Sequence, residues 1–387
     1  MHILNVNSCQ SVKTGGGTAE RTFQMSRFLA AQKGIRCTTL TLDIELDVDR
    51  IKAHAPAIVV VLSCFWKRFY IPMLNVKNWK RICGLVGEVD IIHLMSHWGI
   101  LNMLVYLAAR RARKPYVVCP AGSLALFGRS SWLKKTYNFI VGGSIIRNAS
   151  AWIAVTVGEV PHFESYGISE AKITVIPNGV ARADFANPSK SKFLKRHDLM
   201  DVPIILFMGR LNPIKGPDLL LKAFMLARKV IAHYHLVFAG PDGGMVSELK
   251  KMSVNARISS YVHFLGYLGG DDKSAAYHHA KLLVVPSRQE AMSIVAIEAG
   301  ICGTAALVTD QCGFGEIGIV NKGLQVEATS EGIAGGLINL LKDPSLLEKI
   351  GADYKDFVSR KYLWDSMIVL YTNCFRKTIE SFHKQTE

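Results

Sequence analysis

The stretch VVPSRQEAMSIVAIEAG, residues 284–300, predicts the fold of the second half of the chain because it combines a strand, a turn and a helix. The apolar run 282–285 is typical of a buried parallel strand, which Pro286 ends. Isoleucines at helical spacing then predict a helix, and Gly300 and Gly303 are expected to stop it. A strand followed by a helix is the repeating unit of a parallel α/β sheet.

Two carboxylates in this stretch, Glu290 and Glu298, are candidate site residues. At about 100° per residue, eight helical steps return to within roughly 80° of the start, so both side chains are expected to face one cleft. Free amides at Met292, Ser293 and Ile294 would favour an anion at the helix start. These features predict a phosphorylated, hydroxyl-rich ligand. The spacing alone leaves open a helix with one solvated and one capping glutamate.

Length and composition narrow the class of protein. A chain of 387 residues exceeds what one core usually holds, so two domains are expected. Its apolar runs are all shorter than the roughly 18 to 20 residues that span a bilayer, and the N-terminus shows no signal peptide, so we expect a cytoplasmic protein. The eight cysteines are scattered without a Cys-x-x-Cys pair, and we expect neither a zinc site nor a disulfide framework.

Positive charge is concentrated in one region of the chain. Residues 51–150 contain fourteen Lys and Arg against two acids, which accounts for +12 of the net +15. The charges alternate with aromatic residues, as in segments 65–70, 79–81 and 132–137. Basic residues interleaved with aromatic rings favour an anionic membrane surface. Nucleic acid is the competing partner and is not expected, because no nucleic-acid-binding motif accompanies the charge. A plain solvated basic face stays open.

Strands and helices alternate along the chain as in parallel α/β domains. The expected strands are 2–6, 35–42, 57–62, 91–95, 116–119, 152–155 and 173–176 in the first half, and 203–208, 235–239, 261–265, 282–285 and 305–309 in the second. The polar segment 180–201 between the two series is expected to be an interdomain connection. Ligands should enter at the carboxyl ends of the strands.

A second candidate site motif is FMGRLNPIKGPDLLLKAF, residues 207–224, where Arg210 and Lys215 follow a predicted strand and precede a helix. Two cations at the carboxyl end of a strand can hold a diphosphate by charge-assisted hydrogen bonds. Ordinary loop charges are the alternative. The diphosphate interpretation gains weight because the acidic stretch lies at the mouth of the same predicted sheet.

The ordered motifs resemble those of the retaining nucleotide-sugar glycosyltransferases of family four, also called glycosyl transferases group 1. They extend over most of the chain, and they are residues 7–17, 90–98, 174–180, 209–216, 237–243, 262–268 and 284–298, with a late Trp364. The resemblance implies the GT-B fold, an α/β fold of two Rossmann-like domains that face each other across a cleft. The implied domains are 1–183, which receives the acceptor, 184–361, which binds the nucleotide sugar, and 362–387, a helix that crosses back to the first domain.

The resemblance also implies roles for individual residues. Arg210 and Lys215 would bind the donor diphosphate and stabilise the departing nucleoside diphosphate, so that no metal or other cofactor is required. Glu298 would accept hydrogen bonds from the ribose, and Glu290 would hold the donor sugar. His97 would lie near the donor sugar and the acceptor. The further donor-binding residues would be Gly15, Gly16, Gly17, Gly240, Gly266, Tyr267, Met292, Ser293 and Ile294, and Trp98 would join His97 in binding the acceptor.

The implied reaction moves a sugar from a UDP- or GDP-type donor to an acceptor hydroxyl with retention of configuration, by front-face attack. The expected acceptor is a polyprenyl-diphosphate-linked saccharide of O-antigen, capsule or exopolysaccharide synthesis, on the inner face of the cytoplasmic membrane. A sugar-nucleotide epimerase of the same fold, and a non-catalytic binding protein for nucleotide sugars or nucleic acid, are the alternatives. A Rossmann oxidoreductase is disfavoured because Gly15-Gly16-Gly17 does not match G-x-G-x-x-G.

The chain departs from the family pattern at two places. Where the family has a glycine-rich E-G-F-G turn, this chain has Glu290-Ala291-Met292-Ser293, which puts the choice of donor in question. Where a Gly-Gly pair and a glutamate are common after the strand at 305–309, this chain has Gly313-Phe314-Gly315-Glu316. Glu316 is therefore only a weak candidate for the site.

Overall fold

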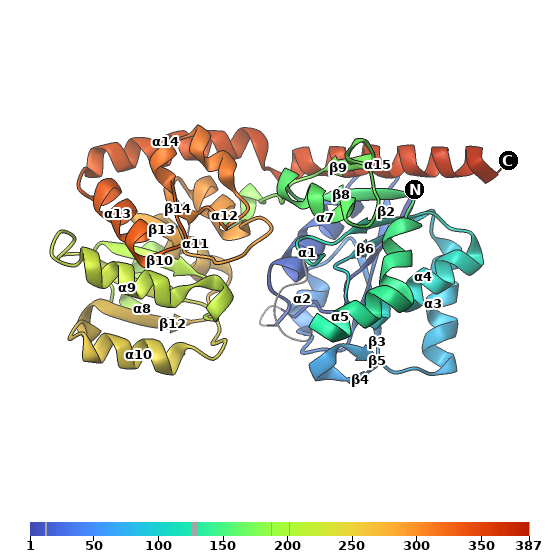
Figure 1. Ribbon diagram of the computed structural model, residues 1–387, viewed down its shortest axis with the longest axis horizontal. Coiled ribbons are helices and arrows are strands. Elements are labelled where there is room, and N and C mark those ends of the chain that lie inside the picture. The colour runs from blue at the N-terminus through green and yellow to red at the C-terminus, as the bar shows by residue number, and fades with distance from the viewer. Residues whose placement is uncertain (12–13, 125–130, 187, 201, 387) are drawn as a thin grey trace. The chain divides into compact units, whose positions relative to one another are not determined.

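The chain folds into two compact units in the computed structural model, which describes residues 1–11, 14–124, 131–186, 188–200 and 202–386 (Figure 1). One unit consists of Met1–Asn178 together with Trp364–Glu387, and the other of Gly179–Leu363. The predicted domain boundary lay after residue 183, and the segment predicted to return to the first domain began at residue 362. The polypeptide passes from one unit to the other at two points that lie side by side, because the Val180 N–H donates to the Tyr362 carbonyl over 2.8 Å.

The segment 180–201, expected to be an interdomain connection, belongs to the second unit. Helix α8 (Lys190–Arg196) packs against helix α11 (Gly270–His279). Phe185 and Phe193 are buried, and Phe193 has no exposed surface. Burial of these two aromatic side chains fixes the segment in the second unit although most of its residues are polar. The average polarity of segment 180–201 therefore gave the wrong interpretation.

The first unit is built on a parallel sheet that, over the described residues, has seven strands in the order β3-β2-β1-β6-β7-β8-β9. The strands are β1 (His2–Val6), β2 (Arg36–Leu42), β3 (Ile58–Leu62), β6 (Ile91–Met95), β7 (Tyr116–Cys119), β8 (Ala151–Ala154) and β9 (Ile173–Val175). A small antiparallel pair, β4 (Cys64–Trp66) and β5 (Ile71–Pro72), follows β3 and was not predicted. The central strands β1 and β6 are buried along their whole length, which explains why they appear in the sequence as mainly apolar runs.

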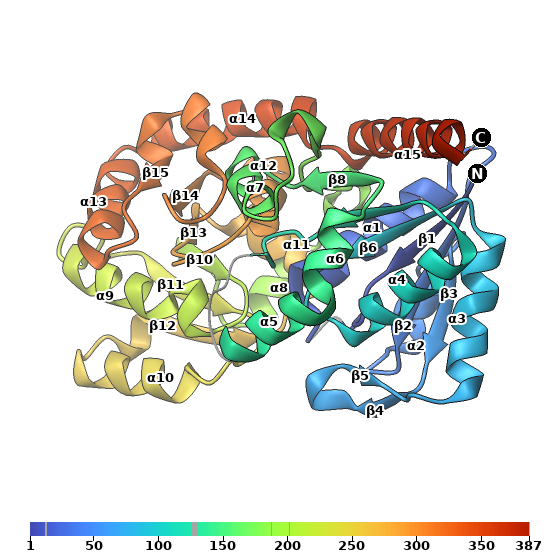
Figure 2. The same cartoon turned by 45° about the vertical axis from the view of Figure 1, so that its right-hand side comes forward.

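Helices cover this sheet, as Figure 2 shows for α1 (Gly16–Ala30), α3 (Val76–Glu88) and α4 (Ile100–Ala112). Ile82 and Val86 of α3 and Leu101 and Val105 of α4 join the strand residues in one hydrophobic cluster. The last helix, α15 (Trp364–Thr386), packs against α1, which confirms that the chain returns to its first unit.

The second unit has a sheet with the order β12-β11-β10-β13-β14-β15, six parallel strands within the part of the chain that the structure describes. Its strands are β10 (Ile204–Met208), β11 (His235–Ala239), β12 (Val262–Gly266), β13 (Leu282–Val285), β14 (Ala306–Thr309) and β15 (Gln325–Val326). Helix α9 (Pro217–Ala227) packs against α13 (Ser330–Leu341), and α12 (Ile294–Cys302) packs against α14 (Pro344–Lys361). Both units are therefore Rossmann-like, as the sequence indicated.

The strand orders place one switch point in each sheet. In the first sheet the order reverses between β1 and β6, and in the second between β10 and β13. Ligands of open α/β sheets bind at the carboxyl ends of the strands at such a point. The glycines at 15–17 follow β1 and His97 follows β6, whereas Lys215 follows β10 and Glu290 follows β13. The four predicted elements therefore lie at the two switch points.

Candidate functional site

The loops after β10 and β13 approach each other closely at Gly216. This glycine has φ +66°, and a Cβ atom there would lie 2.0 Å from the Pro286 carbonyl oxygen. Only a residue without a side chain permits both the left-handed backbone and this contact. Asn212 caps the 3₁₀ turn Pro213–Lys215 by accepting a hydrogen bond from the Lys215 N–H over 3.0 Å. Backbone geometry thus directs Lys215 toward the loop after β13.

Lys215 and Glu290 form an ion pair at this switch point. The Lys215 Nζ lies 2.6 Å from Oε1 of Glu290, and the Ser287 hydroxyl donates to Oε2 over 3.0 Å. The Lys215 side chain is 31% exposed and that of Glu290 14%, so the pair is partly shielded from water and open on one side. A fixed carboxylate beside an ammonium group can accept hydroxyl hydrogen bonds and hold an anion at adjacent positions. The structure brings these two predicted residues together.

The helical relationship predicted between Glu290 and Glu298 is wrong. Helix α12 begins at Ile294, with Ser293 as its N-cap, so Glu290 lies in the preceding turn. The Ser293 hydroxyl accepts a long hydrogen bond of 3.4 Å from the Ala296 N–H, and Met292 is buried. The helix begins at the first of its spaced isoleucines, as expected, but Glu290 and Ala-Met-Ser lie in the turn before it. Rotation per residue therefore cannot relate the two carboxylates.

Glu298 contacts a different pair of residues, both on α11. Its carboxylate lies 2.5 Å from the Lys273 ammonium and accepts a hydrogen bond of 2.7 Å from the Tyr277 hydroxyl. Burial, together with this neighbouring carboxylate, raises the pKa of Tyr277 well above its ordinary value, so that Tyr277 stays a donor. Sequence reasoning missed Lys273 and Tyr277. The sequence feature that could have indicated these two residues is their spacing of four, which puts them on one face of a helix that ends near the β13 strand.

Four more predicted residues, Arg210, Gly240, Gly266 and Tyr267, lie at the carboxyl ends of β10, β11 and β12. The Gly240 N–H donates to the Gly266 carbonyl over 2.6 Å, and a Cβ at Gly240 would lie 1.9 Å from the Gly209 oxygen. These glycines therefore draw the three loops together at the carboxyl edge. Arg210 directly follows Gly209, and Tyr267, which follows Gly266, is partly exposed.

Two supporting features were not predicted. Arg288 makes a two-pronged ion pair with Asp218 at 2.8 and 2.6 Å and donates to the Pro213 carbonyl, which ties the β13 loop to α9. Burial raises the pKa of Asp218, but hydrogen bonds and charge from Arg288 outweigh this and lower it overall. The loop after β14 holds the backbone of Glu290, because the Glu290 N–H donates a hydrogen bond of 2.9 Å to the Gln311 carbonyl. Glu316 instead pairs with Lys361 and the Tyr362 hydroxyl.

In the first unit, the glycine segment begins helix α1. The helix was expected from residue 19 but starts at Gly16, with Gly15 as N-cap. A Cβ at Gly15 would lie 2.4 Å from the Ala19 Cβ and 2.6 Å from the Ser11 oxygen, so the tight turn needs a glycine there. Gly15, Gly16 and Gly17 therefore follow β1 as predicted, but Gly15 caps helix α1 and Gly16 and Gly17 are its first residues, rather than a loop before it.

His97 and Trp98 lie in an aromatic cluster after β6. The His97 Nε2 is 2.8 Å from Oδ1 of Asn138, and its ring packs edge-on against Trp98, Tyr137 and Tyr166. The Trp98 indole N–H donates to the Ser123 carbonyl. Burial lowers the pKa of His97 to about 4, although the Asn138 hydrogen bond partly opposes this. At neutral pH the ring is therefore uncharged and donates to Asn138 through Nε2.

We expect the depressed pKa of His97 to reduce stability in acid. Between pH 6.5 and about 4 the unfolded chain holds a proton that the folded His97 does not, so the free energy of unfolding rises with pH in this window. The contribution is on the order of 3 kcal/mol, fully present above pH 6.5 and lost as pH falls toward 4. Urea unfolding at pH 7 and pH 4.5 measures it. The same pH dependence in His97→Gln as in the parent chain would contradict the assignment.

Over the described residues, no group of three or more His, Cys, Asp or Glu side chains is placed to hold a metal ion.

Comparisons with known proteins agree with the fold. Residues 15–183 match the family described as Glycosyltransferase Family 4, and residues 189–356 match Glycosyl transferases group 1. A D-inositol 3-phosphate glycosyltransferase of Streptomyces bingchenggensis is 26% identical over 77% of this chain and 69% of its own length. The lipopolysaccharide 1,2-N-acetylglucosaminetransferase of Salmonella typhimurium is 29% identical over 51% of this chain and 54% of its own length.

Solved structures resemble the whole chain. HepE of Anabaena in complex with UDP and glucose superposes with a TM-score of 0.79 at 18% identity, covering 97% of this chain and 100% of HepE. Sucrose-phosphate synthase of Thermosynechococcus elongatus also gives 0.79 at 18% identity, with coverage of 98% and 100%. At such identities the likeness establishes the fold.

Proposed function

Since the chain belongs to the glycosyltransferases of family four, which have the GT-B fold, we propose that it moves a sugar from a nucleoside-diphosphate sugar to an acceptor hydroxyl. The observation that carries this proposal is the Lys215–Glu290 ion pair at the β10/β13 switch point. It provides a cation for a diphosphate and, beside it, a carboxylate for sugar hydroxyls. HepE was solved with UDP-glucose, which supports a nucleotide sugar as the donor.

A bound donor would replace the contact between Lys215 and Glu290 with its own contacts to each of these residues. In the structure each member neutralises the other, at 2.6 Å. A diphosphate at Lys215 and Arg210 supplies negative charge to the ammonium group, which frees the Glu290 carboxylate for hydroxyl donors. Ser287 would hold that carboxylate in place during the exchange. The pair therefore preorganises both charges before the donor binds.

In the proposed reaction, catalysis comes from positioning and charge stabilisation. Lys215 and Arg210 stabilise the departing nucleoside diphosphate without a metal ion, and the acceptor hydroxyl attacks from the face that the leaving group vacates, with retention of configuration. Its proton passes to a phosphate oxygen of the leaving group. Because His97 is neutral at physiological pH, its proposed contribution is to orient the acceptor by hydrogen bonding rather than to supply charge.

We place the acceptor among lipid-linked saccharides of cell-surface polysaccharides. The Salmonella relative is a lipopolysaccharide transferase, and WaaG, a glycosyltransferase involved in lipopolysaccharide biosynthesis, superposes with a TM-score of 0.71 at 16% identity over 96% of this chain. An enzyme that extends such an acceptor would work at the inner face of the cytoplasmic membrane. Over the described residues, the structure contains no helix long and apolar enough to cross a bilayer.

Calorimetric titration with UDP-, GDP- and ADP-sugars tests the donor, and analysis of the product with a saccharide acceptor tests transfer. Release of nucleoside diphosphate together with a new glycosidic bond of unchanged anomeric configuration supports the proposal. A free sugar or an epimerised nucleotide sugar would favour the epimerase alternative. Binding without turnover would favour a non-catalytic protein. Activity that vanishes with EDTA would contradict metal independence.

Glu290 and Glu298 should affect different kinetic constants. Glu290→Gln should lower kcat on the order of 10²-fold because it weakens contacts to the transferred sugar, whereas Glu298→Gln should raise the donor KM by about tenfold. Initial rates over a range of donor concentrations measure both. Glu316→Gln, in the same unit but paired with Lys361, is the matched control and should change neither constant. Equal effects of both site variants on kcat would refute this division of roles.

A further inference from the structure

The β4–β5 pair and the start of α3 form an exposed apolar surface, which we call the hairpin patch. Its large exposed side chains are Phe65, Trp66, Phe69, Met73, Leu74 and Val76. Phe65 is 74% exposed, and Trp66 packs edge-on against Phe69 with ring centres 4.6 Å apart. Aromatic rings that contact each other and stay in water are costly unless a partner covers them.

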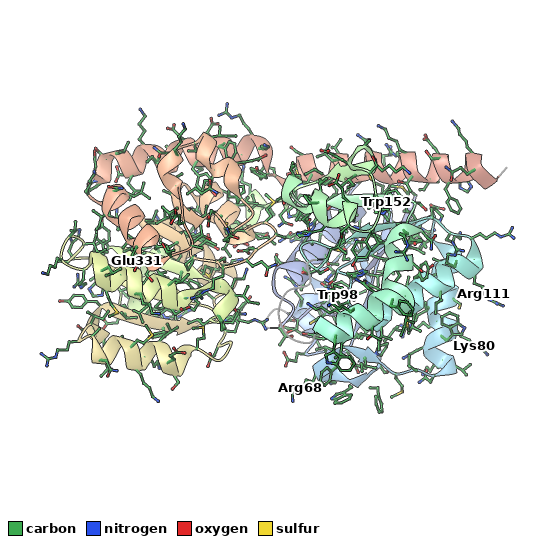
Figure 3. The ribbon with its side chains drawn as sticks, viewed as in Figure 1. Arg68, Lys80, Trp98, Arg111, Trp152 and Glu331 are labelled. Carbon is green, nitrogen blue, oxygen red and sulfur yellow. The ribbon has the colours of Figure 1, made fainter. Side chains whose placement is uncertain are left out.

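The hairpin patch is surrounded by positive charge. Residues 64–81 contain Lys67, Arg68, Lys77, Lys80 and Arg81 and no acidic residue. All five side chains are exposed. Figure 3 shows Arg68 and Lys80 extending from the body of the first unit.

A second exposed apolar surface, the α5 patch, lies on α5 (Ser131–Tyr137) and the π-helical turn Asn138–Gly142 that continues it. Trp132, Leu133, Phe139 and Ile140 are exposed, and Phe139 keeps 91% of its surface in water. Lys134 and Lys135 flank them, and residues 131–147 contain no acid. The residues just before α5, 125–130, lie outside the described part of the chain.

Both patches belong to the carboxyl edge of the first sheet, where the predicted acceptor residues lie. The hairpin follows β3, and α5 follows β7, whereas His97 and Trp98 follow β6 between them in the chain. The Lys134 ammonium lies over the Trp98 ring, 5.3 Å from its centre, so α5 contacts the acceptor residues directly. In both views the hairpin and α5 lie at the same end of the first unit (Figures 1 and 2).

We propose that the hairpin patch and the α5 patch together dock the first unit on an anionic lipid bilayer, with the acceptor residues beside the membrane. Rings and aliphatic side chains with a basic border suit the boundary between headgroups and acyl chains. Leu74, Val76 and Ile140 cannot stack on bases, which disfavours nucleic acid. A second copy of this chain is also disfavoured as the partner, because residues 51–150 of each copy carry a net charge of +12 and would repel each other. The consequence for a lipid-linked acceptor rests on the proposed function, but the docking itself does not.

Flotation with vesicles tests the docking without any measurement of transfer. The protein should float with phosphatidylglycerol–phosphatidylcholine vesicles at low salt, much less with phosphatidylcholine alone, and less as salt rises. The hairpin variant Phe65→Ser, Trp66→Ser, Phe69→Ser and the α5 variant Trp132→Ser, Phe139→Ser, Ile140→Ser should each lower the partition coefficient by about tenfold or more. Lys67→Glu with Arg68→Glu should act similarly without removing apolar surface.

The matched control is Leu226→Ser, Val230→Ser, Val254→Ser, which removes three similarly exposed apolar side chains from the second unit. It should leave flotation unchanged. Equal flotation on neutral and anionic vesicles, or of the parent chain and both patch variants, would overturn the proposal. So would tighter binding to a single-stranded oligonucleotide, or a dimer in light scattering that the hairpin variant abolishes. If flotation succeeds and no nucleotide sugar binds, the docking stands and the proposed function fails.

Discussion

Lys215→Ala should lower kcat/KM for glycosyl transfer by about 10³-fold while the protein stays folded. The reason is that the structure fixes Lys215 as a cation at the β10/β13 switch point. Its backbone is held by the Asn212 cap, and its ammonium group lies 2.6 Å from Glu290. A leaving nucleoside diphosphate gains negative charge as the glycosidic bond breaks, and a fixed cation lowers the energy of that transition state more than that of the bound donor.

The substitution has a second effect, on Glu290. Without Lys215 the carboxylate keeps only its Ser287 hydrogen bond among the side-chain contacts described above, and its charge then repels the donor diphosphate. We therefore expect donor binding to weaken along with kcat. Stopped assays with the purified variant at saturating and at low donor concentration separate the two effects.

Two further variants make this test specific. Lys361→Ala removes the ammonium group of another 2.6 Å Lys–Glu pair in the same unit, away from the switch point, and should leave kcat/KM unchanged. Lys215→Arg keeps the charge but replaces a compact ammonium with a planar fork, so activity should recover only in part. Normal turnover by folded Lys215→Ala would refute the diphosphate assignment.

The buried strands could be predicted because a strand that is buried on both faces appears in the sequence as a short apolar run. The runs 2–6, 91–95, 116–119, 235–239 and 282–285 form strands with those bounds. By contrast, β4 and β15 are only three and two residues long, too short for an apolar pattern to distinguish them from loops. Segment 180–201 shows the opposite error, since a few buried aromatic residues fold a stretch that is polar on average.

The Lys215–Glu290 contact could be inferred from the sequence because it depends on topology. Both residues follow apolar strands, and adjacent parallel strands bring their carboxyl ends together. The partners of Glu298 could not be inferred in this way, because Lys273 and Tyr277 lie within a helix that carries no motif. The prediction that helical rotation relates Glu290 to Glu298 was wrong for a local reason, namely that the Ser293 cap delays the start of the helix until after the Glu290 turn.

Gly313→Ala should be a strongly damaging conservative change near the candidate site. Gly313 has φ +66°, and a Cβ atom there would lie 2.0 Å from the Ala291 oxygen and 2.6 Å from the Glu290 oxygen. Backbone atoms cannot yield as a flexible side chain does, so the turn 290–293 must move. Because Gln311, two residues earlier, accepts the Glu290 N–H, that movement displaces the carboxylate from Lys215. We expect a loss of about 3 kcal/mol or more in unfolding free energy and on the order of 10²-fold in kcat/KM.

Gly303→Ala is the matched control for this prediction. Gly303 also has a left-handed backbone, φ +81°, but a Cβ there would meet only the Lys355 side chain at 3.6 Å. This control variant would therefore bear the conformational penalty of about 1 to 2 kcal/mol without a clash, and its activity should stay normal. Chemical unfolding midpoints and initial rates of both variants provide the comparison. If the two variants lose equal stability and neither loses activity, then the β14 loop does not hold the Glu290 turn in place, and the preorganisation of the ion pair must have another source.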